Sequence, residues 1–212
     1  MKRIAILSSS VRTGRLSHRV ALYLQHYLTA NELAETEILD LKAYDFPLFE
    51  ERFAFLPNPS GKVIDFTERF VAADALIIVT PVYNASFPAA LKNVIDLYLQ
   101  EWRRQPVAVV SVTSGKVPGI ATVQQLQALL LKLGALVVPM LCTVISAGET
   151  FDEKGTAASP AATEKLLRPM IDDQTKAAIL LINSYDDDEV GSLITTNYIC
   201  IRKDMTIRQA MS

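Results

Sequence analysis

Short, almost uninterrupted apolar runs recur along this chain, and segments with the period of an α-helix lie between them. Ile4–Leu7, Ala75–Thr80 and Pro106–Thr113 are the clearest of these runs. A strand that is apolar at nearly every position is buried on both faces, which is typical of a parallel sheet covered by helices on either side. Right-handed crossovers between parallel strands then favour a doubly wound α/β fold.

The full pattern predicts five strands with helices between them. The strands are expected at Ile4–Leu7, Thr36–Leu41, Ala75–Thr80, Pro106–Thr113 and Ala135–Val144. The helices are expected at Leu16–Leu28, Val63–Ala73, Leu91–Trp102 and Val123–Leu133, and from Ser159 to about Ile182. We expect the strand order 2-1-3-4-5, because polar loops follow strands one, three and four and would then share one edge of the sheet.

Composition limits the classes of protein that fit. The chain has 212 residues, of which 50% are hydrophobic and 21% charged, which suits one domain with a sizeable core. The net charge of −2 and the lack of a basic stripe argue against a nucleic-acid partner. No run approaches the ~18 apolar residues of a membrane span. The longest candidate, residues 128–144, is broken by Lys132, Gly134 and Pro139.

The loop after the first expected strand carries hydroxyls and cations next to a helix start. It contains Ser10, Arg12, Arg15 and Ser17. Backbone N–H groups and the positive end of the helix dipole favour anions at such a turn, and an arginine adds charge-assisted hydrogen bonds to phosphate. The loop is neither a Walker A motif nor a dinucleotide fingerprint. A polar loop that only caps the helix is the alternative, and His18 beyond it is interpreted as a surface side chain.

The loop after the third expected strand is the most informative one. It runs from Pro81 to Asn93 and includes Val82, Tyr83, Asn84 and Ser86. Two prolines stiffen it, and an aromatic ring, an amide and a hydroxyl lie between them. Such a loop can support a planar ring system and address its polar edge through backbone N–H groups. A rigid turn that ends in a helix cap is the alternative reading.

The loop after the fourth expected strand has two glycines that would let the backbone approach a flat ligand. Its candidate contact residues are Ser114 and Gly115. Taken alone, ordinary turn chemistry explains it equally well. Three such loops on one edge of a sheet are much stronger evidence of a binding site than any one of them.

Other site types find little support in the sequence. Cys142 and Cys200 lie in apolar runs without disulfide or zinc spacing, so we expect no metal site and free buried thiols in a reducing compartment, the cytoplasm. No Ser-His-Asp or Cys-His constellation is evident, so no catalytic side chain is predicted. Residues 42–60 contain three prolines and five aromatic side chains and are expected to be irregular, either walling an acceptor pocket or covering the core.

These motifs resemble those of the NADPH-dependent FMN reductase family, which has a flavodoxin-like fold and includes azoreductase, quinone reductase and chromate reductase types. The resemblance covers residues 1–183. The second motif, P-x-Y-N-x-S-x-P-x-x-L-K-N, is met in full from Pro81 to Asn93. In the first motif Ser9 replaces the family's glycine, and in the third loop Ser114 stands where glycine is usual.

The resemblance implies an FMN-dependent oxidoreductase that takes hydride from NADPH or NADH. The implied acceptor is a small molecule, such as a quinone, an azo compound, free flavin or a metal oxyanion, reached by a ping-pong cycle. It places the phosphate on Ser10, Arg12 and Ser17, with Arg15 beside them. It places the flavin ring against Pro81–Ser86 and Ser114–Gly115. A non-catalytic flavodoxin-type electron carrier and a flavin-binding regulatory protein are the alternatives.

Assembly and the C-terminal residues give two further expectations. Apolar side chains on more than one face of the segment Leu97–Trp102 predict packing against a partner, and the family resemblance implies a homodimer or homotetramer. Residues 184–212 depart from the reductase pattern and resemble the start of a CBS module of magnesium-transporter type. We expect this extension to act as an arm that supports the oligomer.

Overall fold

A computed structural model describes residues 1–161 and 163. Pro160 and Ala161 are helical, and Thr163 N donates to Ser159 O over 3.1 Å, so a helix begins where it was expected. Three predictions lie outside the described residues: the continuation of that helix to residue 182, the burial of Cys200 as a free thiol, and the CBS-like extension at 184–212. In the described part no helix is long and apolar enough to span a membrane.

The strands form one parallel sheet in the order β2-β1-β3-β4-β5, which confirms the predicted 2-1-3-4-5 order of a flavodoxin-like fold. The strands are β1 (Arg3–Ser8), β2 (Glu35–Asp40), β3 (Ala75–Pro81), β4 (Pro106–Val112), β5 (Leu136–Val137) and β6 (Cys142–Val144). The α-helices are α1 (Ser17–Ala30), α2 (Leu41–Tyr44), α3 (Gly61–Val71), α4 (Ala89–Leu97), α5 (Ile120–Lys132) and α6 (Ala147–Thr150). The described residues also contain the 3-10 turns η1 (Phe53–Phe55) and η2 (Gln100–Trp102).

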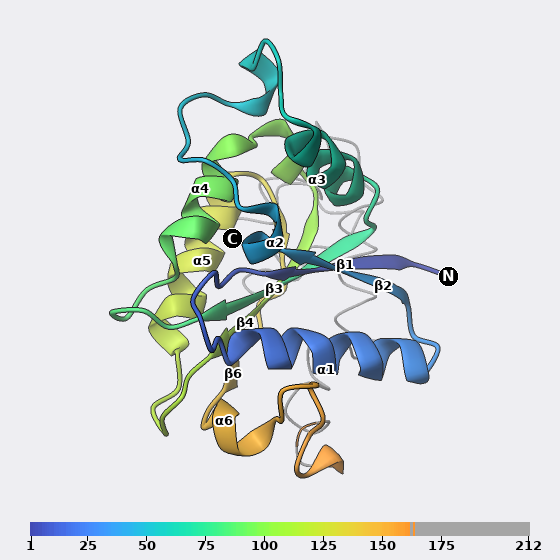
Figure 1. Cartoon of the computed structure of the whole chain (residues 1–212), viewed down its shortest axis with the longest axis vertical. Helices are drawn as coiled ribbons and strands as arrows, with labels where there is room; N and C mark the ends of the chain where they lie inside the picture. Colours follow the sequence, from blue (N-terminus) through green and yellow to red (C-terminus); the bar gives the residue numbers. More distant parts are fainter. Residues whose placement is uncertain (162, 164–212) are drawn as a thin grey trace, which may run out of the picture.

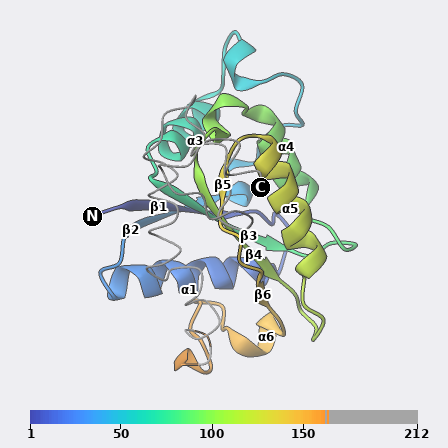
Figure 2. The ribbon, with the colours of Figure 1, turned by 180° about the vertical axis from the view of Figure 1, so that it is seen from behind.

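Helices cover both faces of the sheet, as the unbroken apolar strands require. Figure 1 shows α1 and α6 on one side of the sheet and α3, α4 and α5 on the other, and Figure 2 shows the same layers from behind. Alternate strand residues enter the two cores: Leu76 and Ile78 pack with α3 to α5, whereas Ile77 and Val79 pack with α1. The carboxyl ends of β1, β3 and β4 meet at one edge, away from the N-terminus (Figure 1).

The fifth expected strand is broken in two. Pro106 of β4 is opposite Leu136 of β5, and Val110 of β4 is opposite Cys142 of β6. The segment from Leu136 to Cys142 is therefore two residues longer than the segment of β4 with which it pairs. Pro139 lies in the interruption and has no N–H to give to a ladder. Both pieces pair with β4 in parallel, and the topology is unchanged.

The helix expected at Leu91–Trp102 ends at Leu97, because Tyr98 takes an extended backbone with φ −117° and ψ 150°. This break turns Tyr98 and Trp102 into the core, where each is at most 1% exposed. Trp102 Nε1 donates to Ile95 O over 3.3 Å. Leu97, Tyr98 and Trp102 are therefore packed within the chain itself and need no partner to cover them, whereas Leu99 is half-buried.

Candidate functional site

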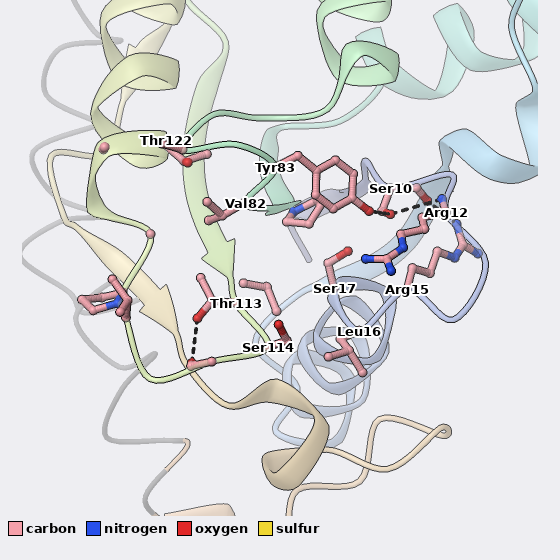
Figure 3. Close-up of a pocket in the computed structure, with 18 of the residues that line it drawn as sticks. Ser10, Arg12, Arg15, Leu16, Ser17, Val82, Tyr83, Thr113, Ser114 and Thr122 are labelled. Carbon is pink, nitrogen blue, oxygen red and sulfur yellow. Dashed lines mark hydrogen bonds between the residues drawn. The ribbon is translucent and has the colours of Figure 1, made fainter.

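A cavity of about 750 Å³ opens at the edge where β1, β3 and β4 end (Figure 3). The loops that follow these three strands form its walls. The predicted residues that line it are Ser10, Arg12, Arg15, Ser17, Pro81, Val82, Tyr83, Ser114 and Gly115. Asn84 and Ser86 are not among its lining residues, whereas Ala85 between them is. The volume lies within the roughly 300–1,000 Å³ typical of cofactor pockets.

The first loop presents hydroxyls and one unpaired cation to the cavity. Ser10 is fully buried, and its Oγ lies 2.8 Å from the Tyr83 hydroxyl, which joins the first loop to the second. Ser17 opens α1, whose N-terminus has no side-chain cap, and Ser17 Oγ is buried without a partner in the described chain. The exposed Arg12 guanidinium has no carboxylate partner within residues 1–161. Free donors, a helix N-terminus and a free cation together make an anion site.

Arg15 is held differently from Arg12. Its guanidinium forms a two-pronged ion pair with Asp40, with Nη2 2.6 Å from Oδ2, and Nη1 also donates to Ser10 O over 2.8 Å. Burial raises the pKa of the Asp40 carboxyl, but hydrogen bonds from Arg15 and from Lys42 N outweigh it and leave the pKa below its usual range. Asp40 was not predicted, because it ends a different strand, 25 residues along the chain.

His18 is half-buried rather than on the surface, which corrects the interpretation of its sequence position. Its Nδ1 lies 2.9 Å from Ser8 Oγ at the end of β1. Burial lowers the pKa of His18, as does the nearby charge of Arg15, and the carboxylate of Asp40 only partly offsets them. The imidazole ring is therefore uncharged at neutral pH, and its hydrogen bond to Ser8 supports the start of the first loop.

The lowered pKa of His18 predicts a pH dependence of stability. The unfolded chain binds a proton at the ordinary value of 6.5 and the folded chain only at lower pH. The free energy of unfolding should therefore fall as the pH drops below about 6.5 and through the folded pKa. His18→Asn, which keeps a short polar group, should flatten this slope in urea unfolding measured at several pH values. An unchanged slope in the variant would contradict the assignment.

The second loop is a tight turn closed by two backbone hydrogen bonds. Tyr83 N donates to Ser86 O over 2.8 Å, and Ser86 N donates to Tyr83 O over 3.0 Å. Asn84 and Ala85 both have positive φ, 51° and 61°, which is the geometry of a type I′ turn. Within the described chain the N–H groups of Asn84 and Ala85 have no acceptor. The turn therefore has two free donors, and Ala85, which lines the cavity, carries one of them.

Gln125 of α5 fixes this turn in place. Ser86 Oγ donates to Gln125 Oε1 over 2.8 Å, and Gln125 Nε2 donates to Ala85 O over 3.0 Å. Ser86 thus anchors the turn to α5 rather than lining the cavity. The role of Gln125 could not be predicted from the sequence, because a polar residue on a helix surface does not indicate which loop will pack against it.

Ala85 carries a backbone conformation that favours glycine, and this predicts a stabilising substitution. A side chain at left-handed φ costs roughly 1–2 kcal/mol, and glycine removes this strain. Glycine also has a larger conformational entropy in the unfolded chain, which offsets part of the stabilisation. Ala85→Gly should therefore raise the free energy of unfolding by about 0.5–1 kcal/mol, measured by urea titration. Ala89→Gly at the exposed start of α4 is the control and should destabilise. A destabilised Ala85→Gly variant would show that the turn is unstrained.

The third loop closes the other end of the cavity. Gly115 O accepts from Thr113 Oγ1 over 3.1 Å and from Ser146 N over 2.8 Å, which holds the loop against the start of α6. Ser114 and Gly115 are exposed toward the cavity. Thr122, in the first turn of α5, is buried and its Oγ1 lacks a partner among described residues. Figure 3 shows Thr113 and Thr122 at the opposite end from Ser10 and Arg12.

The aromatic segment at residues 42–60 does not wall this cavity, since none of its residues lines it. Tyr44, Phe46 and Phe53 instead pack on the core beside α3. Asn93 fastens the segment: its Nδ2 donates to Pro47 O over 2.7 Å and its Oδ1 accepts from Phe49 N over 2.6 Å. The structure thus supports the core-covering alternative, and Asn93 of the second motif serves the fold.

The fold is that of a flavodoxin-like α/β protein, and its cavity has hydroxyls and a cation without a carboxylate partner in the described residues at one end. The model of the family described as NADPH-dependent FMN reductase matches residues 2–150, so the chain belongs to this family. The NAD(P)H-dependent FMN reductase LOT6 of Saccharomyces cerevisiae is 31% identical over an aligned length of 122 residues, and the alignment covers 51% of this chain and 64% of that protein. A quinone reductase of Pseudomonas putida is 35% identical over an aligned length of 122 residues, and the alignment covers 55% of this chain and 62% of that protein. The match thus spans less than two thirds of these relatives.

Solved structures support the fold. FerB, a flavoenzyme NAD(P)H:(acceptor) oxidoreductase from Paracoccus denitrificans, superposes with a TM-score of 0.69 at 24% identity. The superposition covers 83% of this chain and 96% of FerB. An archaeal flavodoxin gives a TM-score of 0.54 at 10% identity, over 82% of this chain and 99% of that one.

Proposed function

We propose that this chain binds FMN in the cavity and transfers hydride from NADPH or NADH to a small acceptor. The observation that carries the proposal is the division of one cavity into two ends. Ser10, Arg12 and Ser17 place hydroxyls and a cation at one end, and Val82, Tyr83 and the third loop bound the rest of the cavity. A ligand that joins one phosphate to a planar ring system matches both ends.

Polar groups without partners fit this ligand. Ser17 Oγ at the anion end is buried and unpaired in the described chain, and a phosphate oxygen would satisfy it. The free N–H groups of Asn84 and Ala85 can donate to the acceptor atoms at the polar edge of a flavin. A buried group without a partner costs free energy, so a ligand that satisfies Ser17 Oγ gains affinity there.

When bound, FMN supplies the capacity to accept a hydride and pass the electrons on. The chain's residues supply position and electrostatics. Arg12 and the N-terminus of α1 hold the phosphate, and the Ser10–Tyr83 hydrogen bond keeps that site at a fixed distance from the second loop. The rigid turn at Asn84–Ala85 aims its N–H groups, and no side chain need donate or remove a proton in a covalent step.

One cavity is proposed to serve the nicotinamide and the acceptor in turn, which is a ping-pong cycle. The acceptor would be a quinone, an azo compound, free flavin or a metal oxyanion. A homodimer or homotetramer in the cytoplasm stays part of the proposal, on the family resemblance, with light scattering as its measurement. A flavodoxin-type carrier is the second candidate, favoured by the likeness to the archaeal flavodoxin. Oxidation of NAD(P)H by the purified protein would exclude that carrier role.

The choice of FMN over FAD follows from an anion site with a single free arginine and no dinucleotide fingerprint. Titration of the flavin-free protein with FMN and with FAD, followed by flavin fluorescence, should show tighter binding of FMN. Riboflavin, which lacks the phosphate, is the matched control and should bind more weakly than either. Equal or tighter binding of FAD would contradict the assignment.

A further inference from the structure

A chain of polar contacts runs from the end of β2 to the second loop. Asp40 pairs with Arg15, Arg15 donates to Ser10 O, and Ser10 Oγ meets the Tyr83 hydroxyl. The side chains of Arg15 and Asp40 are only 13% and 19% exposed. Three segments far apart in the sequence are thereby tied together on one side of the cavity, and Figure 3 shows Arg15 beside Ser10 and Arg12.

The hydrogen-bond inventory of Arg15 leaves it little to offer a ligand. A guanidinium has five N–H donors, and both hydrogens of Nη1 are used, one on Asp40 and one on Ser10 O. Nη2 gives another to Asp40. The carboxylate also neutralises the charge of Arg15, so the cation that the first loop leaves for an anion is Arg12. Arg15 lines the cavity, but three of its five donors are already given to Asp40 and Ser10.

Asp40 is itself held in place by the start of α2. It is the N-cap of α2, and its Oδ1 accepts from Lys42 N over 3.0 Å. The same carboxylate therefore fixes a helix end and a guanidinium. Fixing Arg15 fixes the Ser10 carbonyl and hence the peptide that leads to Arg12, two residues further on.

We infer that Asp40 is a positioning residue of the anion site, which acts through Arg15 on the backbone of Ser10, and that Arg15 is a strut rather than a phosphate ligand. This inference rests on the proposed function for the identity of the anion. It reassigns Arg15, which the family resemblance placed with the phosphate-binding residues.

The test compares Asp40→Asn, Arg15→Met and the double variant. Asparagine keeps a side-chain oxygen for the α2 cap, and methionine keeps much of the packing of arginine. Glu37→Gln is the matched control, because Glu37 lies on the same strand and pairs with Arg69 away from the cavity. FMN affinity should fall about tenfold in each single variant, on the order expected for a charge-assisted hydrogen bond, and by the same factor in the double variant. Glu37→Gln should leave it unchanged.

A second readout needs no flavin. Arg12 is exposed, so trypsin can cut after it when the first loop opens. Release of the fragment 1–12 from the flavin-free protein, followed by mass spectrometry, should be about tenfold faster in Asp40→Asn and in Arg15→Met than in Glu37→Gln, because cleavage follows the population of the open loop.

The alternative makes opposite predictions. If Arg15 bound the phosphate directly, Asp40→Asn would free its charge, and FMN would bind as tightly as before or more tightly. That result, or equal cleavage rates in Asp40→Asn, Arg15→Met and Glu37→Gln, would overturn the inference. A wild-type protein that takes up no FMN would overturn the proposed function alone, and the cleavage rates would still decide the role of Asp40. Should Asp40→Asn fail to fold, the comparison of Arg15→Met with Glu37→Gln decides it.

Discussion

Replacing Arg12 by alanine is expected to weaken FMN binding roughly tenfold to a hundredfold. A partly desolvated hydrogen bond between a guanidinium and a phosphate contributes on the order of 1.5–3 kcal/mol, and the described chain gives Arg12 no carboxylate that would compete for it. The fold should be unaffected, because the side chain is exposed and takes no part in the core.

Flavin fluorescence titration of the flavin-free protein measures the effect of Arg12→Ala, and thermal unfolding checks the fold. Arg52→Ala is the control, since Arg52 is an exposed cation that does not line the cavity. It should bind FMN as the wild type does. An Arg12→Ala variant with unaltered affinity would show that this guanidinium is merely solvated.

Gly119→Ala is expected to disturb both stability and the ring end of the cavity. A Cβ at Gly119 would lie 2.5 Å from Val82 Cγ2 and 2.7 Å from Ser111 Oγ. Neither neighbour is the far end of a flexible side chain, so α5 or Val82 must shift, which costs about 1–3 kcal/mol of unfolding free energy. Val82 lines the cavity, and FMN affinity should therefore fall as well.

Gly61→Ala is the control for this substitution, because a Cβ there meets nothing within 4 Å and Gly61 is the first residue of α3. It should leave stability unchanged or slightly raised. Urea unfolding and flavin titration of both variants measure the two effects. A Gly119→Ala protein as stable as Gly61→Ala would show that the contact between α5 and the second loop is loose.

The sheet could be predicted from the sequence because its signal is local. Apolar runs of a few residues and helical periods identify strands and helices, and the crossover rule then leaves few topologies. The break of strand five at Pro139 and the end of α4 at Leu97 were missed, since both depend on how the segment meets its neighbours. Tyr98 and Trp102 read as extra helical faces until the core that receives them is known.

In the candidate site, too, local features could be predicted and contacts between distant segments could not. The three loops could be predicted to meet because parallel strands end at one edge, and most of the chosen residues do line the cavity. Partners that approach from elsewhere could not be predicted. Asp40 comes from the end of β2, and Gln125 from the surface of α5. Their contacts decide which way Arg15 and Ser86 face, and the sequence near those two residues carries no trace of it.

In the proposed function, FMN held in this cavity takes hydride from NADPH or NADH and gives it up to a small acceptor. Anaerobic mixing of the FMN-loaded protein with NADPH, followed by a quinone, tests it most directly by visible absorption. We expect the flavin absorption to bleach on the first addition and to return on the second. A flavin that stays oxidised with both NADPH and NADH would contradict it.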